Sequence, residues 1–341
     1  MADVIFMDGF DSYDSANNQS VRPGVHSKWV IVNPSNIFFS EGRYGGQGMN
    51  LGNTAFGCQI RGFFNGNVFQ QSATFAFAYK TDFVARAEGQ GQMFSVLHNQ
   101  TSQFAVSVSN IGQLRLWRGN TMVAESEPNI IHTHDWHFFE LEYVGHTSAG
   151  RATLFIDGVE VLNFNGNTQN AAAYGVNGIQ FNAGNESGYI IDDLYVINEA
   201  TRIGERRIET LRPNGDVTVA FTPSTPGSNY AMLNETLVSA NNYVSATALG
   251  AKDMYNFSNL TTNPDKIDAI QLNVWAAKTD AETRELATIV KSGSTETTSA
   301  NYNLPTNHLN MNRIENLNPA TGTAWDITSV NAIQAGYEIK K

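Results

Sequence analysis

The sequence predicts an all-β protein built from two successive β-sandwiches. Apolar and polar residues alternate with a period of two in both halves of the chain, and no long stretch has the helical period of 3.6. Glycine occurs 29 times, while charged residues make up only 16% of the chain. That composition is typical of β-sandwiches, because their many tight turns require glycine.

Individual strands are visible in the first half. Residues 103–110 and 136–144 alternate apolar with polar side chains, as expected of strands with one buried face. Residues 151–156 and 159–162 are two further apolar runs, joined by Asp157-Gly158. Asp-Gly between such runs predicts a hairpin, because a tight primed turn requires positive φ angles.

We expect a domain boundary near residue 198, where the alternation stops and polar residues take over. Residues 1–198 then form the first domain, and residues 199–341 form a second, smaller β-sandwich. Strands are predicted at 270–276 and 336–340. One helical turn is predicted within 326–333, which begins with a capping aspartate and continues with apolar residues three positions apart.

The charge balance argues against a nucleic-acid partner. The formal net charge is −11 and the sequence pI is about 5.1, so the surface repels phosphate backbones. Cys58 is the only cysteine, which fits a chain folded in a reducing bacterial cytosol. Neither a secretion signal nor an apolar stretch of about 20 residues is visible, so we expect no membrane insertion.

Several segments carry a resemblance to one class of protein. They are Phe6-Met-Asp-Gly-Phe-Asp-Ser-Tyr13, Arg43-Tyr-Gly-Gly-Gln47, residues 188–196, residues 204–216 and residues 318–325. Together they resemble the concanavalin A-like, laminin G-like jelly-roll domains of tailed-phage structural proteins, with the connector that follows such a domain.

The resemblance implies a non-enzymatic structural component of a tailed-bacteriophage virion, in capsid decoration or in the tail and adsorption apparatus. It would be made in the host cytoplasm and work in the virion with other capsid or tail proteins. We expect a homo-oligomer, most simply a trimer, because exposed edge strands must be paired or blunted. The second domain would make these contacts, with Trp275 as an interface residue.

The resemblance also suggests a structural calcium ion. In some jelly-roll lectins an aspartate in the strand equivalent to 188–196 helps to hold calcium, so Asp193 of the Asp192-Asp193 pair would bind it together with Asp8 and Asp11. The alternative is that these aspartates cap turns or pair with Arg43. A second metal candidate is the histidine run at 132–137, where His132 and His134 would share one face of a strand; the alternative is packing.

Aromatic residues beside asparagine and arginine in predicted turns suggest a sugar-binding site. The candidates are Phe63, Phe64, Asn65, Trp117, Arg118 and Asn120. Rings stack on the apolar face of a sugar, and amides bond its hydroxyl groups. The alternative is that the rings belong to the core or to a subunit interface. Recognition of a host surface glycan is therefore the alternative function to a purely structural role.

Catalytic signatures are missing from the sequence. Glycan-degrading relatives of this fold carry the run Glu-x-Asp-x-x-Glu, because glycosidic cleavage needs two placed carboxylates. Here Glu140 and Glu142 stand between apolar residues and are expected on an ordinary solvent face. Cys58 lies in an apolar run and is expected to be buried and inert. We therefore expect no enzymatic activity and keep a glycan hydrolase only as a weak alternative.

Overall fold

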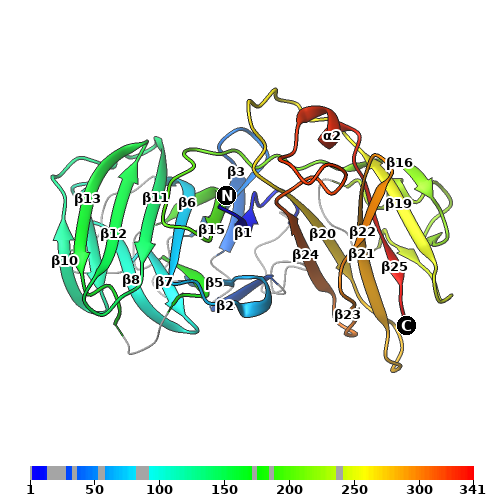
Figure 1. Ribbon diagram of the computed structural model, residues 1–341, viewed down its shortest axis with the longest axis horizontal. Helices are drawn as coiled ribbons and strands as arrows, with labels where there is room; N and C mark the ends of the chain where they lie inside the picture. Colours follow the sequence, from blue (N-terminus) through cyan, green and yellow to red (C-terminus); the bar gives the residue numbers. More distant parts are fainter. Residues whose placement is uncertain are drawn as a thin grey trace. The chain divides into compact units, whose positions relative to one another are not determined.

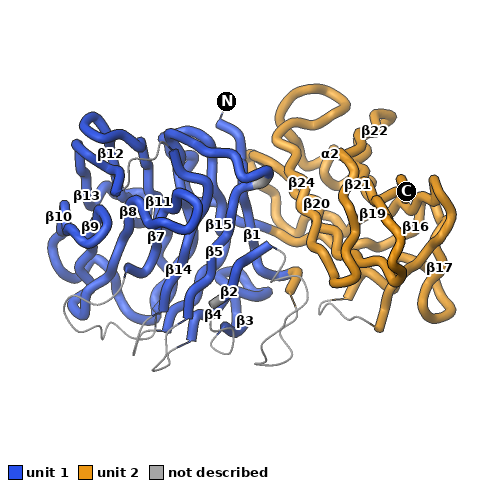
Figure 2. The backbone as a smooth tube through the Cα atoms, turned by 90° about the horizontal axis from the view of Figure 1, so that it is seen from below, with its two compact units in different colours: residues 1–11, 15–22, 28–208 blue, residues 12–14, 23–27, 209–341 orange. Residues whose placement is uncertain are grey.

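The computed structural model describes residues 2–13, 28–32, 37–52, 58–81, 92–170, 175–183, 188–235 and 241–341. The chain forms two compact units (Figure 2): residues 1–11, 15–22 and 28–208 make the first, and residues 12–14, 23–27 and 209–341 make the second. Nearly every regular element is a strand, so the prediction of an all-β fold is confirmed. No helix in the described ranges is long and apolar enough to cross a membrane.

The first unit contains an antiparallel sheet of eight strands. Its order is β13 (Val159–Gly166), β12 (Gly150–Ile156), β11 (Trp136–Val144), β6 (Ser72–Thr81), β15 (Tyr189–Ile197), β4 (Gln47–Leu51) and β3 (Ile37–Glu41). The first strand of the chain, β1 (Val4–Asp8), also pairs with β15, which joins the beginning of the unit to its last strand.

A second antiparallel sheet of seven strands completes the sandwich (Figure 1). Its order is β10 (Thr121–Glu125), β9 (Leu114–Arg118), β8 (Thr101–Val108), β7 (Phe94–His98), β14 (Gly178–Ala183), β5 (Cys58–Phe63) and β2 (Trp29–Val32). Aromatic rings fill the space between the sheets. Phe77 of the first sheet packs edge-on against Phe181 and Phe94 of the second, with centroids 5.0 and 5.2 Å apart. Cys58 is buried, as predicted.

The hairpin predicted at Asp157-Gly158 is confirmed. Asp157 and Gly158 have φ angles of 51° and 81°, as a primed turn requires. The Asp157 carboxylate lies 2.7 Å from His137 Nδ1 and also accepts a hydrogen bond from the Phe138 amide. His137 Nε2 accepts from the backbone amide of His132, so this histidine run ties the hairpin to the strand beside it.

Residues 199–204 cover part of the outer face of the eight-stranded sheet. Glu140 on β11 accepts a hydrogen bond from the Gly204 amide and pairs with Arg202 at 3.3 Å. The Tyr195 hydroxyl donates to the Gly204 carbonyl, and the Thr74 hydroxyl donates to the Glu199 carbonyl. This segment belongs to the first unit, which therefore continues past residue 198 to Ile208.

The expectation that Glu140 lies on a solvent face was wrong. Its side chain is 1% exposed, because the chain after β15 turns back over it. Glu142, two positions along the same strand, is half-buried and pairs with Arg151 at 3.1 Å. An alternating pattern shows that a face is polar, and it does not show whether another segment covers that face.

The second unit is built around a six-stranded antiparallel sheet. The sheet contains β16 (Pro213–Thr218), β19 (Lys252–Phe257), β25 (Gln334–Ile339), β21 (Glu285–Ser292) and β22 (Thr295–Thr298), with β23 (Tyr302–Asn303) also paired to β21. The strands β20 (Ile270–Ala276) and β24 (Leu309–Glu315) form a separate ribbon, and β17 (Thr222–Pro223) pairs with β18 (Val244–Ser245).

The predicted helical turn is present as α2 (Ile327–Asn331). Asp326 is its N-cap and accepts a hydrogen bond from the Ser329 amide at 2.7 Å, while the Ser329 hydroxyl oxygen accepts from the Asp326 amide. Val330 and Ile333 then pack against Trp325 in a core cluster of this unit. The cap and the apolar spacing were both readable in the sequence.

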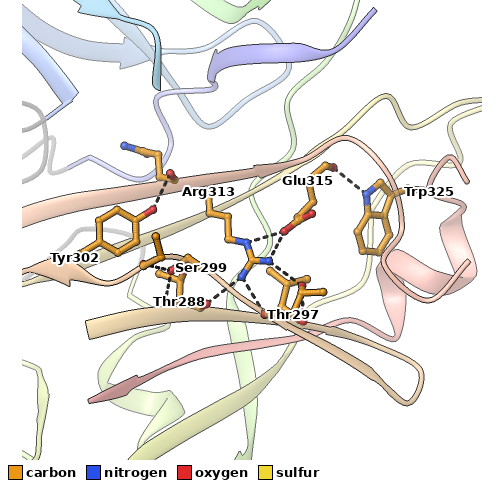
Figure 3. Close-up of polar contacts among 10 residues, drawn as sticks. Thr288, Thr297, Ser299, Tyr302, Arg313, Glu315 and Trp325 are labelled. Atoms are coloured by element: carbon orange, nitrogen blue, oxygen red, sulfur yellow. Dashed lines mark hydrogen bonds and ion pairs between the residues drawn. The ribbon is translucent and has the colours of Figure 1, made fainter. Parts of the chain in front are cut away.

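Arg313 connects the β20–β24 ribbon to the six-stranded sheet (Figure 3). Its Nη1 donates to the carbonyls of Thr288 on β21 and Thr297 on β22, both at 3.0 Å. Its Nε donates to the carboxylate of Glu315. The backbone carbonyl of Glu315 in turn accepts a hydrogen bond from the Trp325 indole. The guanidinium is therefore a largely buried link between three parts of the second unit.

We expect Arg313→Ala to lower the free energy of unfolding of the second unit by about 2–4 kcal/mol, because it leaves Glu315 without its ion-pair partner. Urea denaturation measures this change. Arg284→Ala is the control, since Arg284 pairs with Asp280 in full contact with solvent and its loss should not move the midpoint. Equal midpoints for the two variants would show that the Arg313 link adds nothing to stability.

Candidate ligand-binding face

The outer face of the seven-stranded sheet carries an unbroken row of side chains from five strands. Strand pairing places Arg61 opposite Gln180, Gln180 opposite Ser95, Ser95 opposite Ala105, and Ala105 opposite Trp117. Residues directly opposite in antiparallel strands point to the same face of a sheet. We call this row and the amide side chains beside it the amide face.

Strand periodicity fixes which way these residues point. In β14, Ile179 and Phe181 are fully buried in the aromatic core, so Gln180 between them points outward. In β5 the same alternation turns Ile60 inward and Arg61 outward. The apolar core therefore determines the composition of the opposite face.

Four side chains at one end of the amide face form a closed hydrogen-bond set. Arg61 Nε donates to Gln180 Oε1 at 2.6 Å, and Arg61 Nη2 donates to Gln59 Oε1 at 2.5 Å. Gln59 and Gln180 then donate their amide N–H groups to Asn182 Oδ1, at 2.8 and 3.0 Å. Each glutamine bonds with both ends of its amide group, so its orientation is fixed.

Gln92 organises the middle of the face. Its Oε1 accepts from the hydroxyls of Ser95 and Ser102, and its Nε2 donates to the carbonyl of Gly119. The backbone carbonyl of Gln92 accepts a hydrogen bond from Asn182 Nδ2 at 2.9 Å, which joins this group to the set around Arg61. The polar groups of the face thus form one connected network across the strands.

Aromatic side chains flank the row. Trp117 is half-buried at its far end, and its indole N–H donates to the Ser107 hydroxyl at 2.8 Å. Met122, opposite Trp117 on the neighbouring strand, is 45% exposed. Phe63 is half-buried two residues after Arg61 on β5. The face therefore offers ring surface beside fixed hydrogen-bonding groups.

The structure separates the six residues predicted to bind sugar. Phe63 and Trp117 lie on the amide face, Arg118 is half-buried at the end of β9, and Asn120 is exposed in the following turn. Phe64 was a wrong choice: it is 2% exposed and its ring packs against Phe6 and Phe75 in the core. Asn65 begins the 3₁₀ turn Asn65–Asn67, and its side chain lies outside the described residues.

The aspartates proposed as calcium ligands have partners within the protein. Asp8 accepts from the Trp29 indole at 2.9 Å and pairs with Lys28 at 3.2 Å. Asp11 accepts from the Gln47 amide at 2.7 Å. No group of three or more His, Cys, Asp or Glu side chains in the described ranges is arranged to hold a metal ion, the run at 132–137 included. Calcium therefore stays a prediction.

Asp192 and Asp193 form a buried acidic pair. Asp192 accepts from the backbone amides of Arg43 and Asp193, and Asp193 Oδ1 accepts from the Ile208 amide. Asp193 Oδ2 has no hydrogen-bond partner in the described part of the chain. Burial raises the pKa of both carboxyl groups above the ordinary range, and their mutual repulsion raises the pKa of Asp192 further, to about 8.

The acidic pair leads to a prediction of how the stability of the folded protein depends on pH. A carboxyl group whose pKa is raised on folding favours the folded state when protonated, so stability should fall as the pH rises from about 5 to about 8. Asp193→Asn should flatten that fall, because it removes one of the two titrating carboxyl groups and its repulsion of the other. Asparagine also tolerates the positive φ angle of 49° at this position.

Chemical denaturation at a series of pH values measures the effect. Asp280→Asn is the control, because Asp280 is fully exposed and its pKa is lowered, so this change should leave the fall in place. Wild-type stability that rises between pH 5 and pH 8 would contradict the account of the acidic pair.

Comparison with known proteins gives structural similarity only. No protein-family model and no curated protein sequence matches the chain. Among solved structures, a carbohydrate esterase of the Shiga toxin-encoding bacteriophage phi24B is 12% identical, with 57% of this chain and 100% of that chain covered and a TM-score of 0.37.

Two further structures are similar at the same level. An endo-β-1,4-glucuronan lyase from the fungus Trichoderma reesei is 12% identical, with 61% of this chain and 99% of that chain covered and a TM-score of 0.36. Domain 4 of an extracellular arabinanase from Geobacillus stearothermophilus, solved with arabinotriose, is 15% identical, with 58% and 93% covered and a TM-score of 0.40.

These findings correct the expectation that the chain is not an enzyme. That expectation took the missing Glu-x-Asp-x-x-Glu run as evidence against catalysis. The similar structures include an esterase and a lyase, whose reactions differ from glycoside hydrolysis. The absence of one hydrolase signature therefore does not exclude catalysis on a glycan.

Proposed function

We propose that this chain is a glycan-binding protein of a tailed-phage particle, and that the amide face of its first unit binds the glycan. The observation that supports this best is the row from Arg61 through Gln180, Ser95 and Ala105 to Trp117. Ser95 and Ala105, between the polar end and the aromatic end, are fully buried, so a ligand would contact the two ends of the row and not its middle.

The chemistry of the row suits a sugar. Hydroxyl groups both donate and accept, and the side-chain amides at Gln59, Gln180 and Asn182 provide both functions. The apolar face of a pyranose ring stacks on an indole such as Trp117. Because the amides are fixed by their mutual hydrogen bonds, little side-chain entropy is lost when a ligand binds.

Trp117→Ala should weaken glycan binding at least tenfold, or by about 1.4 kcal/mol, because it removes the stacking surface. Isothermal titration with oligosaccharides released from the bacterial host surface measures the affinity. Trp136→Ala is the matched control, since Trp136 is half-buried on β11 of the opposite sheet of the same unit. Wild-type affinity in Trp117→Ala, or no affinity in the wild type, would overturn the proposal.

We further propose that the second unit attaches the chain to capsid or tail proteins. The same unit would also join three copies of the chain into a trimer. Its edge strand β16 begins with Pro213 and carries two bulges, and both features oppose strand-to-strand addition. Association through exposed apolar side chains is therefore favoured. Leu249 is 74% exposed and Val219 is 57% exposed.

Light scattering of the purified chain tests the assembly step. We expect a trimer that Leu249→Asp dissociates, because a charge at an apolar contact loses its water without gaining a partner. Val159→Asp, at a 64% exposed site in the first unit, should leave the trimer intact. A monomer at every concentration, with no affinity for capsid or tail proteins, would remove the support for assembly.

A further inference from the structure

Arg61 on β5 is held by neutral amide groups. Its guanidinium is half-buried and contacts three neutral amide oxygens, those of Gln59, Gln100 and Gln180, at 2.5, 3.3 and 2.6 Å. A guanidinium has five N–H groups. Three are used, so two remain, one on each terminal nitrogen.

Four other arginines of this unit have carboxylate partners, whereas Arg118 and Arg207 have none among the described residues. The pairs are Arg43 with Glu205, Arg115 with Glu125, Arg151 with Glu142, and Arg202 with Glu140. No carboxylate of the described residues pairs with Arg61. A positive charge that is partly withdrawn from water and not neutralised is costly, and an anionic ligand relieves that cost.

The surroundings of Arg61 are set to receive an anion. Gln59 and Gln180 turn their oxygens to the guanidinium because their N–H₂ groups bond to Asn182. The next residues along the row, Gln180, Ser95 and Ala105, are uncharged, so no negative side chain of the row opposes an anion at Arg61. The guanidinium is thus held in place before any ligand arrives.

We infer that the amide face selects glycans that bear a carboxylate, such as uronic or sialic acids, and that Arg61 is the residue that recognises that group. This inference rests on the proposed function. A carboxylate offers two oxygen acceptors, which matches one free N–H on each terminal nitrogen of Arg61. Trp117 lies four strand positions away from Arg61, about 19 Å at the usual strand spacing, so it would stack on a sugar ring several units further along the glycan.

The experiment uses the full chain and an array in which each uronate- or sialate-bearing glycan is printed beside its carboxyl-reduced counterpart. We expect the wild type to bind the acidic member at least tenfold more tightly, with binding that weakens as salt rises. Arg61→Gln should remove this preference. Arg61→Lys should keep part of it, because lysine retains the positive charge but lacks the two parallel N–H donors of a guanidinium. Phosphorylated sugars on the same array test whether any anion suffices.

Arg115→Gln is the matched control, because Arg115 lies on the same sheet and already has its carboxylate partner, so the preference should persist. Thermal melting of each variant shows whether it is folded before binding is compared. Equal binding to both members of every pair, or a preference for phosphorylated sugars, would overturn the role of Arg61 and leave glycan binding standing. No binding to any glycan would overturn both.

Discussion

The aromatic layer between the two sheets of the first unit is the interaction on which the candidate site depends. Phe77 stacks on Phe139 in its own sheet, with centroids 5.2 Å apart, and reaches Phe94 and Phe181 across the sandwich. Once these rings point inward, strand geometry forces the residues between them outward. A one-residue slip of β14 would place Gln180 in the core and remove the centre of the amide face.

The two sheets use their outer faces differently. The eight-stranded sheet is partly covered by its own chain, because residues 199–204 lie over Glu140 and satisfy its carboxylate. The Glu140 carboxylate can be buried in its charged form only because each of its oxygens has a hydrogen-bond or ion-pair partner. On the seven-stranded sheet the polar groups bond mainly to one another, and Arg61 keeps spare donors. The same fold thus satisfies its buried charge on one side and leaves guanidinium donors unused on the other.

The sequence was sufficient for the fold class, the hairpin at Asp157-Gly158 and the cap at Asp326, because each depends on residues close together in the chain. Trp117 and Phe63 were named as candidates because they are aromatic residues near turns. Arg61 and Gln180 were missed, although they alternate with apolar neighbours, because their pairing joins strands far apart in the sequence. Phe64 was misplaced because a ring in a turn looks the same whether it points outward or into the core.

The pairing of β1 with β15 has a consequence for how the protein is made. Val4 lies opposite Ile197, so the first strand has no partner until nearly the whole unit has been synthesised. Closing so long a loop is entropically costly, and contacts of high sequence separation slow folding. The N-terminal strand must therefore wait with its apolar residues unpaired, and the newly made chain is most prone to aggregation during that interval.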